Sequence, residues 1–151
     1  MQQHIKITKE GLAALQKEYE QLKIQRVDAV GHLKKSREMG DLSENGYYKA
    51  SRLKLSFIDR QIREVSSLLK ASVVTQPITA HSVSFGSTVS IREGKNSVTY
   101  QIVSSREADP AKNLISEHSP IGRALLGKKV GESVTITIPQ GIILYTVEKI
   151  A

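Results

Sequence analysis

Two stripes of apolar residues at heptad spacing, separated by a glycine, constrain the fold of this chain more than any other feature. The first stripe follows Thr8, a candidate helix N-cap, and the second follows Gly40. Spacings of three and four residues place these side chains on one narrow face of a helix, which is typical of a two-helix seam. The stripes comprise Leu12, Leu15, Tyr19, Leu22, Ala29 and Leu33, and then Tyr48, Leu55, Ile58, Ile62, Val65 and Leu69.

Folding the chain back on itself near residue 42 brings the two stripes face to face. Facing residues then have numbers that sum to about 84, so that Leu22 meets Ile62. Arg26 interrupts the apolar pairing opposite Ile58, but its aliphatic stem can pack while its charge reaches water. The sequence therefore predicts an antiparallel coiled-coil hairpin, with arms of roughly 30 residues and a length of about 45 Å.

The second half of the chain has a different pattern, with short alternating segments of β-branched residues joined by turn residues. Between the second and third segments, Ser119 and Pro120 mark the start of a short helix and Gly127 marks its end. We therefore expect an α+β chain, with the helical hairpin in residues 1–75 and an antiparallel β domain with one short helix in residues 76–151. The β segments are residues 87–91, 97–103, 133–138 and 142–147.

Composition narrows the classes of protein to which the chain can belong. It has 151 residues and no cysteine, which excludes a disulfide framework and thiolate metal sites. No apolar signal segment opens the sequence, and no run approaches the ~20 apolar residues of a membrane span, so we expect a cytoplasmic protein without a membrane partner.

The formal net charge of +7 lies mostly in the first half of the chain. Residues 1–75 hold 14 Lys and Arg against 9 Asp and Glu, which gives +5. Such an excess favours polyanionic partners such as nucleic acid. A solvated helical face explains the same excess equally well.

Residues 37–45, R-E-M-G-D-L-S-E-N, form the bend between the two helical stretches. Asp41 and Glu44 have the spacing of a capping box, in which Asp41 caps the second helix and Glu44 reaches back to its first amides. The same carboxylates are hard oxygen donors that suit Mg²⁺, but two ligands need others from a partner to hold the ion. Six bases that suit an anionic target flank the bend: Lys34, Lys35, Arg37, Lys49, Arg52 and Lys54.

The stretch S-R-E-M-G-D-L-S-E-N-G-Y-Y-K-A-S-R resembles the coiled-coil tip of the bacterial Gre transcript-cleavage factors of the GreA/GreB type. Those factors carry a similar A-R-x-x-G-D-L-x-E-N-A-x-Y signature. The opening I-T-K-E-G-L resembles the first helix of the family, and F-G-S-T-V, E-A-D and N-L-I-S-E-H-S-P-I-G-R-A-L-L-G-K resemble its C-terminal domain. The resemblance covers essentially the whole chain.

This resemblance implies that the chain is not an enzyme but an accessory factor of RNA polymerase. Its C-terminal domain is expected to be FKBP-like and to dock outside the polymerase, while the hairpin enters the secondary channel. RNA polymerase then cleaves the 3′ end of its own backtracked transcript. The implied partners are RNA polymerase and the 3′ end of the nascent RNA, DNA binding is a further expectation, and the factor itself is expected to be a monomer.

The resemblance also implies roles for particular residues. Asp41 and Glu44 match the acidic pair that helps to bind a catalytic Mg²⁺ ion and its water. This ion is shared with the polymerase active site, so the isolated protein is expected to bind no metal. Arg37 and Arg52 match basic positions near the tip that favour the RNA. Together with Lys34 and Lys49 of the basic cluster, they are the expected nucleic-acid-binding residues. The expected polymerase-docking residues are Ser119, Pro120, Ile121 and Arg123.

Departures from the family pattern keep two alternatives open. Met39 stands where the family often has His, and Gly46-Tyr47 replaces the common Ala-Glu. These changes leave the GreA-like or GreB-like cleavage pattern open. They also keep, as the alternative to a cleavage factor, an inhibitory paralogue that enters the channel without promoting cleavage. A prolyl isomerase or other binding module on the β domain is the third hypothesis. Phe85 and two tyrosines give that domain few aromatic side chains for such a pocket.

Overall fold

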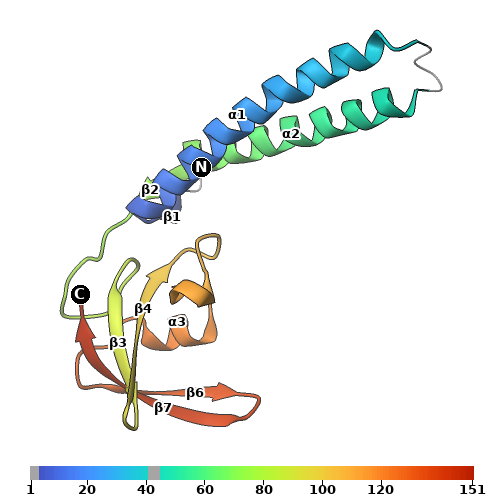
Figure 1. Cartoon of the computed structure of the whole chain (residues 1–151). Coiled ribbons are helices and arrows are strands. Elements are labelled where there is room, and N and C mark those ends of the chain that lie inside the picture. The colour runs from blue at the N-terminus through green and yellow to red at the C-terminus, as the bar shows by residue number, and fades with distance from the viewer. Residues whose placement is uncertain (1–3, 41–44) are drawn as a thin grey trace. The chain divides into compact units, whose positions relative to one another are not determined.

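The computed structural model describes residues 4–40 and 45–151, which divide into two compact units (Figure 1). The first unit contains Leu12–Ser72. The second contains Val73–Ala151 together with Lys6–Gly11, so the first helical turn of the chain groups with the β domain. No helix among the described residues is both long and apolar enough to cross a membrane.

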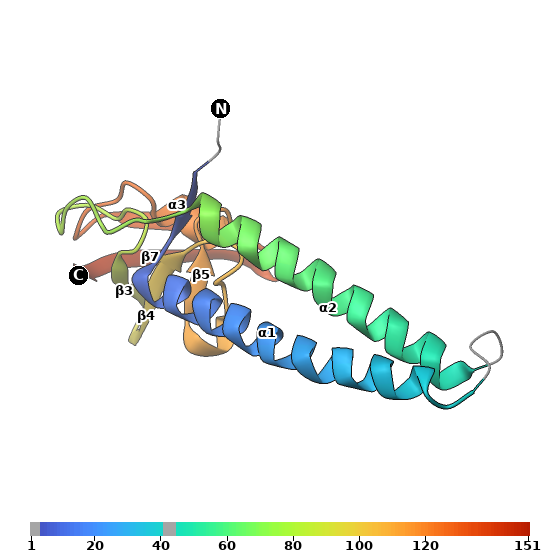
Figure 2. The ribbon, with the colours of Figure 1, turned by 90° about the horizontal axis from the view of Figure 1, so that it is seen from above.

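The first unit is the predicted helical hairpin, formed by α1 (Lys9–Arg37) and α2 (Gly46–Ala71). Figure 2 shows the two helices running side by side. The buried residues recur every seven positions on both helices, as a coiled-coil seam requires. They are Leu15, Leu22, Ala29 and Ser36 on α1, and Ser51, Ile58 and Val65 on α2.

The polar contacts between the helices agree with the register expected from the sequence. Arg26 is exposed, and its Nε donates to Oδ1 of Asp59 over 2.6 Å. Asp59 is the neighbour of Ile58, the residue predicted to face Arg26. The predicted partner of Leu22, Ile62, is half-buried, so that layer combines one fully and one partly covered side chain.

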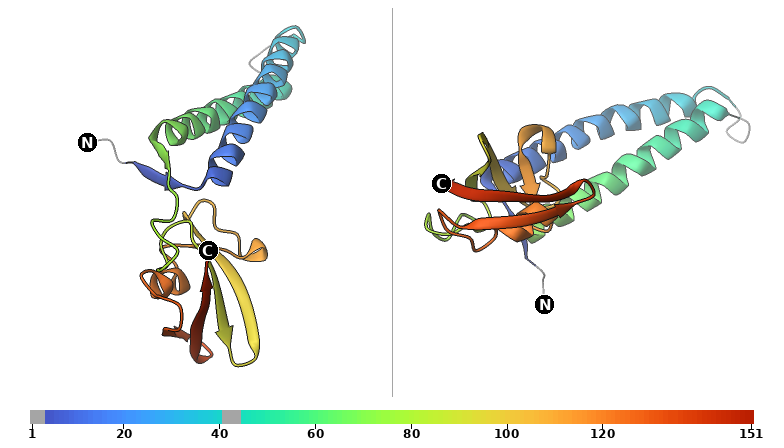
Figure 3. Two further views of the ribbon diagram at one scale, coloured as in Figure 1. Left: turned by 90° about the vertical axis from the view of Figure 1, so that its left-hand side faces the viewer. Right: turned by 90° about the horizontal axis from the view of Figure 1, so that it is seen from below.

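A five-stranded sheet with the order β5-β4-β3-β7-β6 forms the second unit (Figure 3). Strands β3 (Thr88–Glu93), β4 (Asn96–Val103), β6 (Ser133–Ile138) and β7 (Gly141–Ile150) pair antiparallel, as the alternation predicts. Strand β5 (Leu114–Ser116) was not expected, and it pairs parallel to β4. The sheet is therefore mixed rather than purely antiparallel. Three half-buried residues are too few to produce an alternating pattern.

The predicted short helix, α3 (Pro120–Leu125), closes the core of this unit against strands β5 and β6. Leu125 has no exposed surface. A Cβ added to Gly122 would lie 2.0 Å from the carbonyl oxygen of Ser116, so only glycine allows this close approach. The core comprises Val83, Val89, Ile91, Ile102, Leu125, Val134, Ile136, Val147 and Ile150.

Two further strands, β1 (Ile5–Ile7) and β2 (Ser72–Val74), pair with each other in a separate small sheet. The sequence did not indicate either strand. A backbone hydrogen bond from Thr75 N to Ile7 O, over 2.9 Å, continues the pairing. A short 3-10 helix, η1 (Pro110–Lys112), precedes β5.

Candidate functional site: the hairpin end and the loop before α3

The predicted acidic pair, Asp41 and Glu44, lies outside the described residues, but the structure describes the helix ends on both sides of it. Helix α2 begins at Gly46, and its N-cap is Asn45, whose Oδ1 accepts a hydrogen bond from Tyr48 N over 3.1 Å. The capping-box prediction, with Asp41 as the N-cap of the second helix, is therefore wrong. Asn45 is closer to the first helical turn and supplies the cap itself.

The end of α1 is fixed by contacts around Ser36, which is fully buried. Its hydroxyl donates to Leu33 O over 2.7 Å, and its carbonyl accepts the side-chain amide of Asn45 over 2.9 Å. Gly40 has a φ of +113°, a left-handed conformation that suits glycine at the predicted bend. Because the side chain of Asn45 bonds to the backbone of Ser36, the end of α1 is joined to the start of α2.

The four predicted nucleic-acid-binding residues, Lys34, Arg37, Lys49 and Arg52, are exposed on the two helices near this end of the hairpin. The first turn of α2 carries no acidic residue. Helix N-termini also carry a partial positive charge, which adds to the charge of the side chains. Among the described residues, this end of the hairpin therefore carries more exposed positive than negative charge, with Glu38 as the exposed acid.

Among the described residues, no group of three or more His, Cys, Asp or Glu is placed to hold a metal ion. The predicted ligands, Asp41 and Glu44, are oxygen donors of the kind that Mg²⁺ prefers. Two such donors fit the ion only as part of a larger ligand set.

Two of the predicted docking residues serve the fold of the loop before α3. Ser119 caps the helix, because its Oγ accepts from Gly122 N over 3.0 Å and donates to Ser116 O over 2.7 Å. Ile121 is half-buried and packs against the core. These two residues therefore have local structural roles whether or not they contact a partner.

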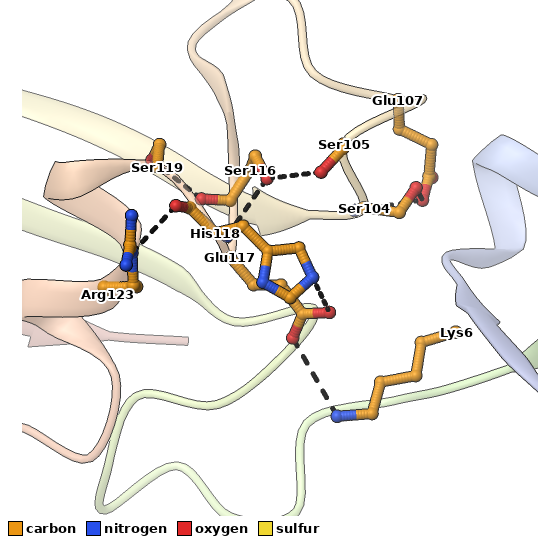
Figure 4. A network of polar contacts seen from close by, with 9 residues as sticks. All are labelled: Lys6, Ser104, Ser105, Glu107, Ser116, Glu117, His118, Ser119 and Arg123. Carbon is orange, nitrogen blue, oxygen red and sulfur yellow. Dashed lines mark hydrogen bonds and ion pairs between the residues drawn. The ribbon is translucent and has the colours of Figure 1, made fainter.

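The other two predicted docking residues, Pro120 and Arg123, are exposed on α3. The Nε of Arg123 donates to the carbonyl of His118 over 2.9 Å, as Figure 4 shows. This bond holds the guanidinium against the loop while leaving it accessible. Pro120 and Arg123 are thus the two exposed residues of the predicted docking set.

A polar network that sequence reasoning missed lies beside this loop (Figure 4). The carboxylate of Glu117 lies 3.8 Å from Lys6 Nζ and 3.6 Å from His118 Nε2. A second carboxylate, that of Glu107, accepts hydrogen bonds from Thr8 and from Ser104. In the sequence, Glu107 stands out only as part of the E-A-D motif. No sequence pattern indicates that its hydrogen-bond partner is Thr8, near the start of the chain.

Comparisons with known proteins identify the family. The N-terminal model of the GreA/GreB transcription elongation factors matches residues 5–74, and the C-terminal model of the same factors matches residues 78–151. Together the two models cover nearly the whole chain. The chain belongs to the GreA/GreB family of transcription elongation factors, and the resemblance of its motifs is confirmed.

Two relatives named GreA agree in sequence with the family models. Transcription elongation factor GreA of Nautilia profundicola is 42% identical over 149 residues, which cover 95% of this chain and 92% of the relative. GreA of Caldanaerobacter subterraneus subsp. tengcongensis is 40% identical over 95% of this chain and 94% of its own. The crystal structure of GreA factor homolog 1 of Thermus thermophilus aligns with 99% of both chains at 25% identity and a TM-score of 0.47. Family membership rests on the sequence matches.

Proposed function

We propose that this protein is a transcript-cleavage factor, which stimulates RNA polymerase to cut backtracked nascent RNA and so rescues arrested complexes. The observation that carries the proposal is its similarity to factors named GreA over 95% of the chain, together with the G-D-L-S-E-N motif between the helices. As in the rest of the family, the factor is an accessory protein and the cleavage activity belongs to the polymerase.

The proposed chemistry assigns Asp41 and Glu44 to the polymerase active site. The hairpin enters the secondary channel, and the two carboxylates complete the ligand set of a Mg²⁺ ion that the polymerase also binds. A bound Mg²⁺ supplies Lewis-acid activation of water for attack on a phosphodiester. The exposed bases Lys34, Arg37, Lys49 and Arg52 contact the phosphates of the RNA 3′ segment and position it.

The β domain, residues 76–151, is the proposed docking unit. It contacts the outside of the polymerase through Pro120 and Arg123, which are exposed, while Ser119 and Ile121 hold the docking loop in shape. In this arrangement the β domain provides the affinity for the polymerase, and the hairpin provides the residues that act in cleavage. DNA binding, a monomeric state and a cytoplasmic location remain predictions.

An inhibitory factor that occupies the same channel is the second candidate function. It is favoured by Met39 and by Tyr47, whose phenol takes part in a hydrogen bond with His32 instead of providing the usual acidic side chain. The rate of RNA 3′-end shortening in stalled elongation complexes, with and without the protein, separates the two functions. An accelerated rate supports the cleavage factor, whereas an unchanged or lowered rate with retained polymerase binding supports the inhibitor.

A further inference from the structure

A surface hollow lies between the two helices near the bend. Its volume is about 220 Å³, and it is lined by Ala29, His32, Tyr47, Ala50, Ser51 and Lys54. In the half of the seam away from the bend the buried residues are Leu, Ile and Val, whereas towards the bend they are Ala29, Ser36 and Ser51. Because these side chains are small, they leave space that the larger seam residues fill further along the hairpin.

Two aromatic side chains, His32 and Tyr47, form one wall of the hollow and are joined by a hydrogen bond. Nδ1 of His32 and the phenolic oxygen of Tyr47 are 3.0 Å apart, which joins α1 to α2 across the hollow. The bond fixes a ring that is 42% exposed, so a ligand can reach it. A fixed, accessible ring beside an apolar floor is suited to a flat, apolar partner such as a base.

The sequence around the hollow has an excess of positive charge. Between Ala29 and Ile58 it holds six bases against three acids, Glu38, Asp41 and Glu44. Lys54, which lines the hollow, is exposed. Further along α2, Phe57 is 50% exposed and the guanidinium of Arg60 lies 5.3 Å from the centre of its ring. The matching ligand therefore has flat apolar rings linked by negative charges, which describes single-stranded nucleic acid.

We propose that this hollow is a stacking site for one unpaired base of the RNA. The ring of Tyr47, oriented by His32, stacks on the base, the small residues of the floor accommodate it, and Lys54 contacts a neighbouring phosphate. The inference rests on the proposed function, which brings a single-stranded RNA segment to this end of the hairpin. The proposed site adds recognition of a base to the binding of the phosphates. It also assigns a binding role to Tyr47, at a position where an acidic side chain is usual.

The test measures binding of a short fluorescent single-stranded RNA to the full chain at low salt, without polymerase. Tyr47→Leu should weaken binding by about 5-fold or more, because stacking on an aromatic ring contributes about that much or more per base. Tyr47→Phe retains the ring and should lose less. Tyr19→Leu is the matched control, since Tyr19 also lies beside a cation, Lys23, on the same hairpin. It lines a different depression and should leave RNA binding unchanged.

An abasic RNA of the same length separates stacking from charge. Wild-type protein and Tyr47→Leu should bind the abasic RNA equally, because no base is present to stack. Lys54→Gln should weaken binding of both RNAs and lower the slope of log affinity against log salt by about 0.7. Equal weakening of both RNAs by Tyr47→Leu would overturn the proposal.

A second variant tests the hollow without removing the ring. Ala50→Leu fills the space, leaves the charge unchanged and substitutes one good helix former for another. It should weaken binding of normal RNA and not of abasic RNA, with unchanged helical content by circular dichroism. Unchanged binding of normal RNA by Ala50→Leu would show that the hollow does not bind a base. A concentration-dependent dimer that Tyr47→Leu abolishes would show that a second copy of the chain occupies the hollow instead of a base.

Failure of this inference can be distinguished from failure of the proposed function. If Tyr47→Leu binds RNA as wild type does, while the wild-type protein accelerates cleavage in stalled complexes, the stacking site is wrong and the cleavage function stands. If base-dependent RNA binding requires Tyr47 but the wild-type protein does not accelerate cleavage, the stacking site stands and the function fails.

Discussion

The side chain of Asn45 joins the two helices of the hairpin by bonding to Ser36. Its amide donates to the carbonyl of Ser36 over 2.9 Å, while its oxygen accepts from the backbone N–H of Tyr48 over 3.1 Å. One residue thus caps α2 and ties it to the last turn of α1. The acidic pair, Asp41 and Glu44, lies in the chain between these two bonded residues.

Variants of Asn45 should separate its two roles. Asn45→Asp retains the cap acceptor but loses the donor to Ser36, whereas Asn45→Ala loses both. We expect Asn45→Ala to lower the free energy of unfolding by about 2 kcal/mol, from one cap and one hydrogen bond. Asn45→Asp should cost about half as much. Thermal unfolding of the full chain is the measurement, and equal melting of the two variants would contradict the bridging role.

The coiled-coil register predicts coupling between Leu22 and Ile62. Each change to alanine should cost about 2–4 kcal/mol of hairpin stability, as large-to-small substitutions in a packed core do. The effects should be non-additive because facing residues share a contact. Denaturant unfolding of the two single variants and the double variant measures the coupling. Strictly additive losses would argue against residue numbers that sum to 84.

The sequence was a good guide where a repeating pattern faces a buried surface. Heptad spacing predicted the hairpin, and Arg26 was correctly placed at the solvent edge of the seam, where its charge pairs with Asp59. Strand alternation and the signals at Ser119 and Pro120 predicted four strands and α3. In each case the local sequence and the packing favour the same structure.

Features built from short segments or distant partners were not predictable in the same way. The three-residue strand β5 is too short to show alternation, so its parallel pairing was missed. The sequence does not single out Asn45 as the N-cap of α2, because Asp41 also has a side-chain oxygen that can cap a helix and has Glu44 at the spacing of a capping box. The hollow beside Tyr47 depends on small residues from both helices, which become neighbours only after the register is fixed.

The carboxylate of Glu107 should stabilise the β domain by holding the start of the chain. It accepts from the backbone N–H of Thr8 over 3.3 Å and from the hydroxyl of Ser104 over 2.7 Å. Glu107→Gln replaces one carboxylate oxygen with an NH₂ group, which then faces the N–H of Thr8 or the hydroxyl of Ser104. It should cost about 1–3 kcal/mol, the range for leaving a partly buried polar group unsatisfied.

Gly11 offers an independent check on Glu107. A Cβ at Gly11 would lie 2.0 Å from Oε1 of Glu107, so Gly11→Ala must displace the carboxylate. The destabilisation by Gly11→Ala should therefore be smaller in the Glu107→Ala background, where the obstructing carboxylate is absent. Thermal unfolding of the two single variants and the double variant measures this. Equal losses in both backgrounds would show that the predicted crowding has no energetic effect.

Reversing the charge of Arg123 should affect docking rather than folding. Arg123→Glu removes one surface hydrogen bond to His118 and places a negative charge on the proposed docking helix. We expect weaker competition for polymerase binding, with a change in melting of about 1 kcal/mol or less. Lys95→Glu is the charge-matched control, on the exposed turn between β3 and β4. If both variants compete like the wild type, α3 is not the docking surface.

Asp41→Asn is the sharpest test of the acidic pair. Because Asn45 supplies the cap of α2, loss of the Asp41 charge should barely change melting or polymerase binding. Cleavage should fall by at least ~10-fold, a loss of about 1.4 kcal/mol in transition-state stabilisation. Glu44→Gln should behave alike, whereas Glu38→Gln, an exposed carboxylate just before the pair, should cleave normally.

The dependence on Mg²⁺ distinguishes a metal ligand from a carboxylate that only shapes the turn. A weakened ligand set binds the ion less tightly, so higher Mg²⁺ should partly restore cleavage by Asp41→Asn through mass action. The rate of 3′-end shortening in a backtracked complex, measured across a Mg²⁺ titration, gives the answer. Cleavage by Asp41→Asn at the wild-type rate would exclude the metal role. A reduced rate that Mg²⁺ leaves unchanged would place the carboxylate at the RNA or the water instead of the ion.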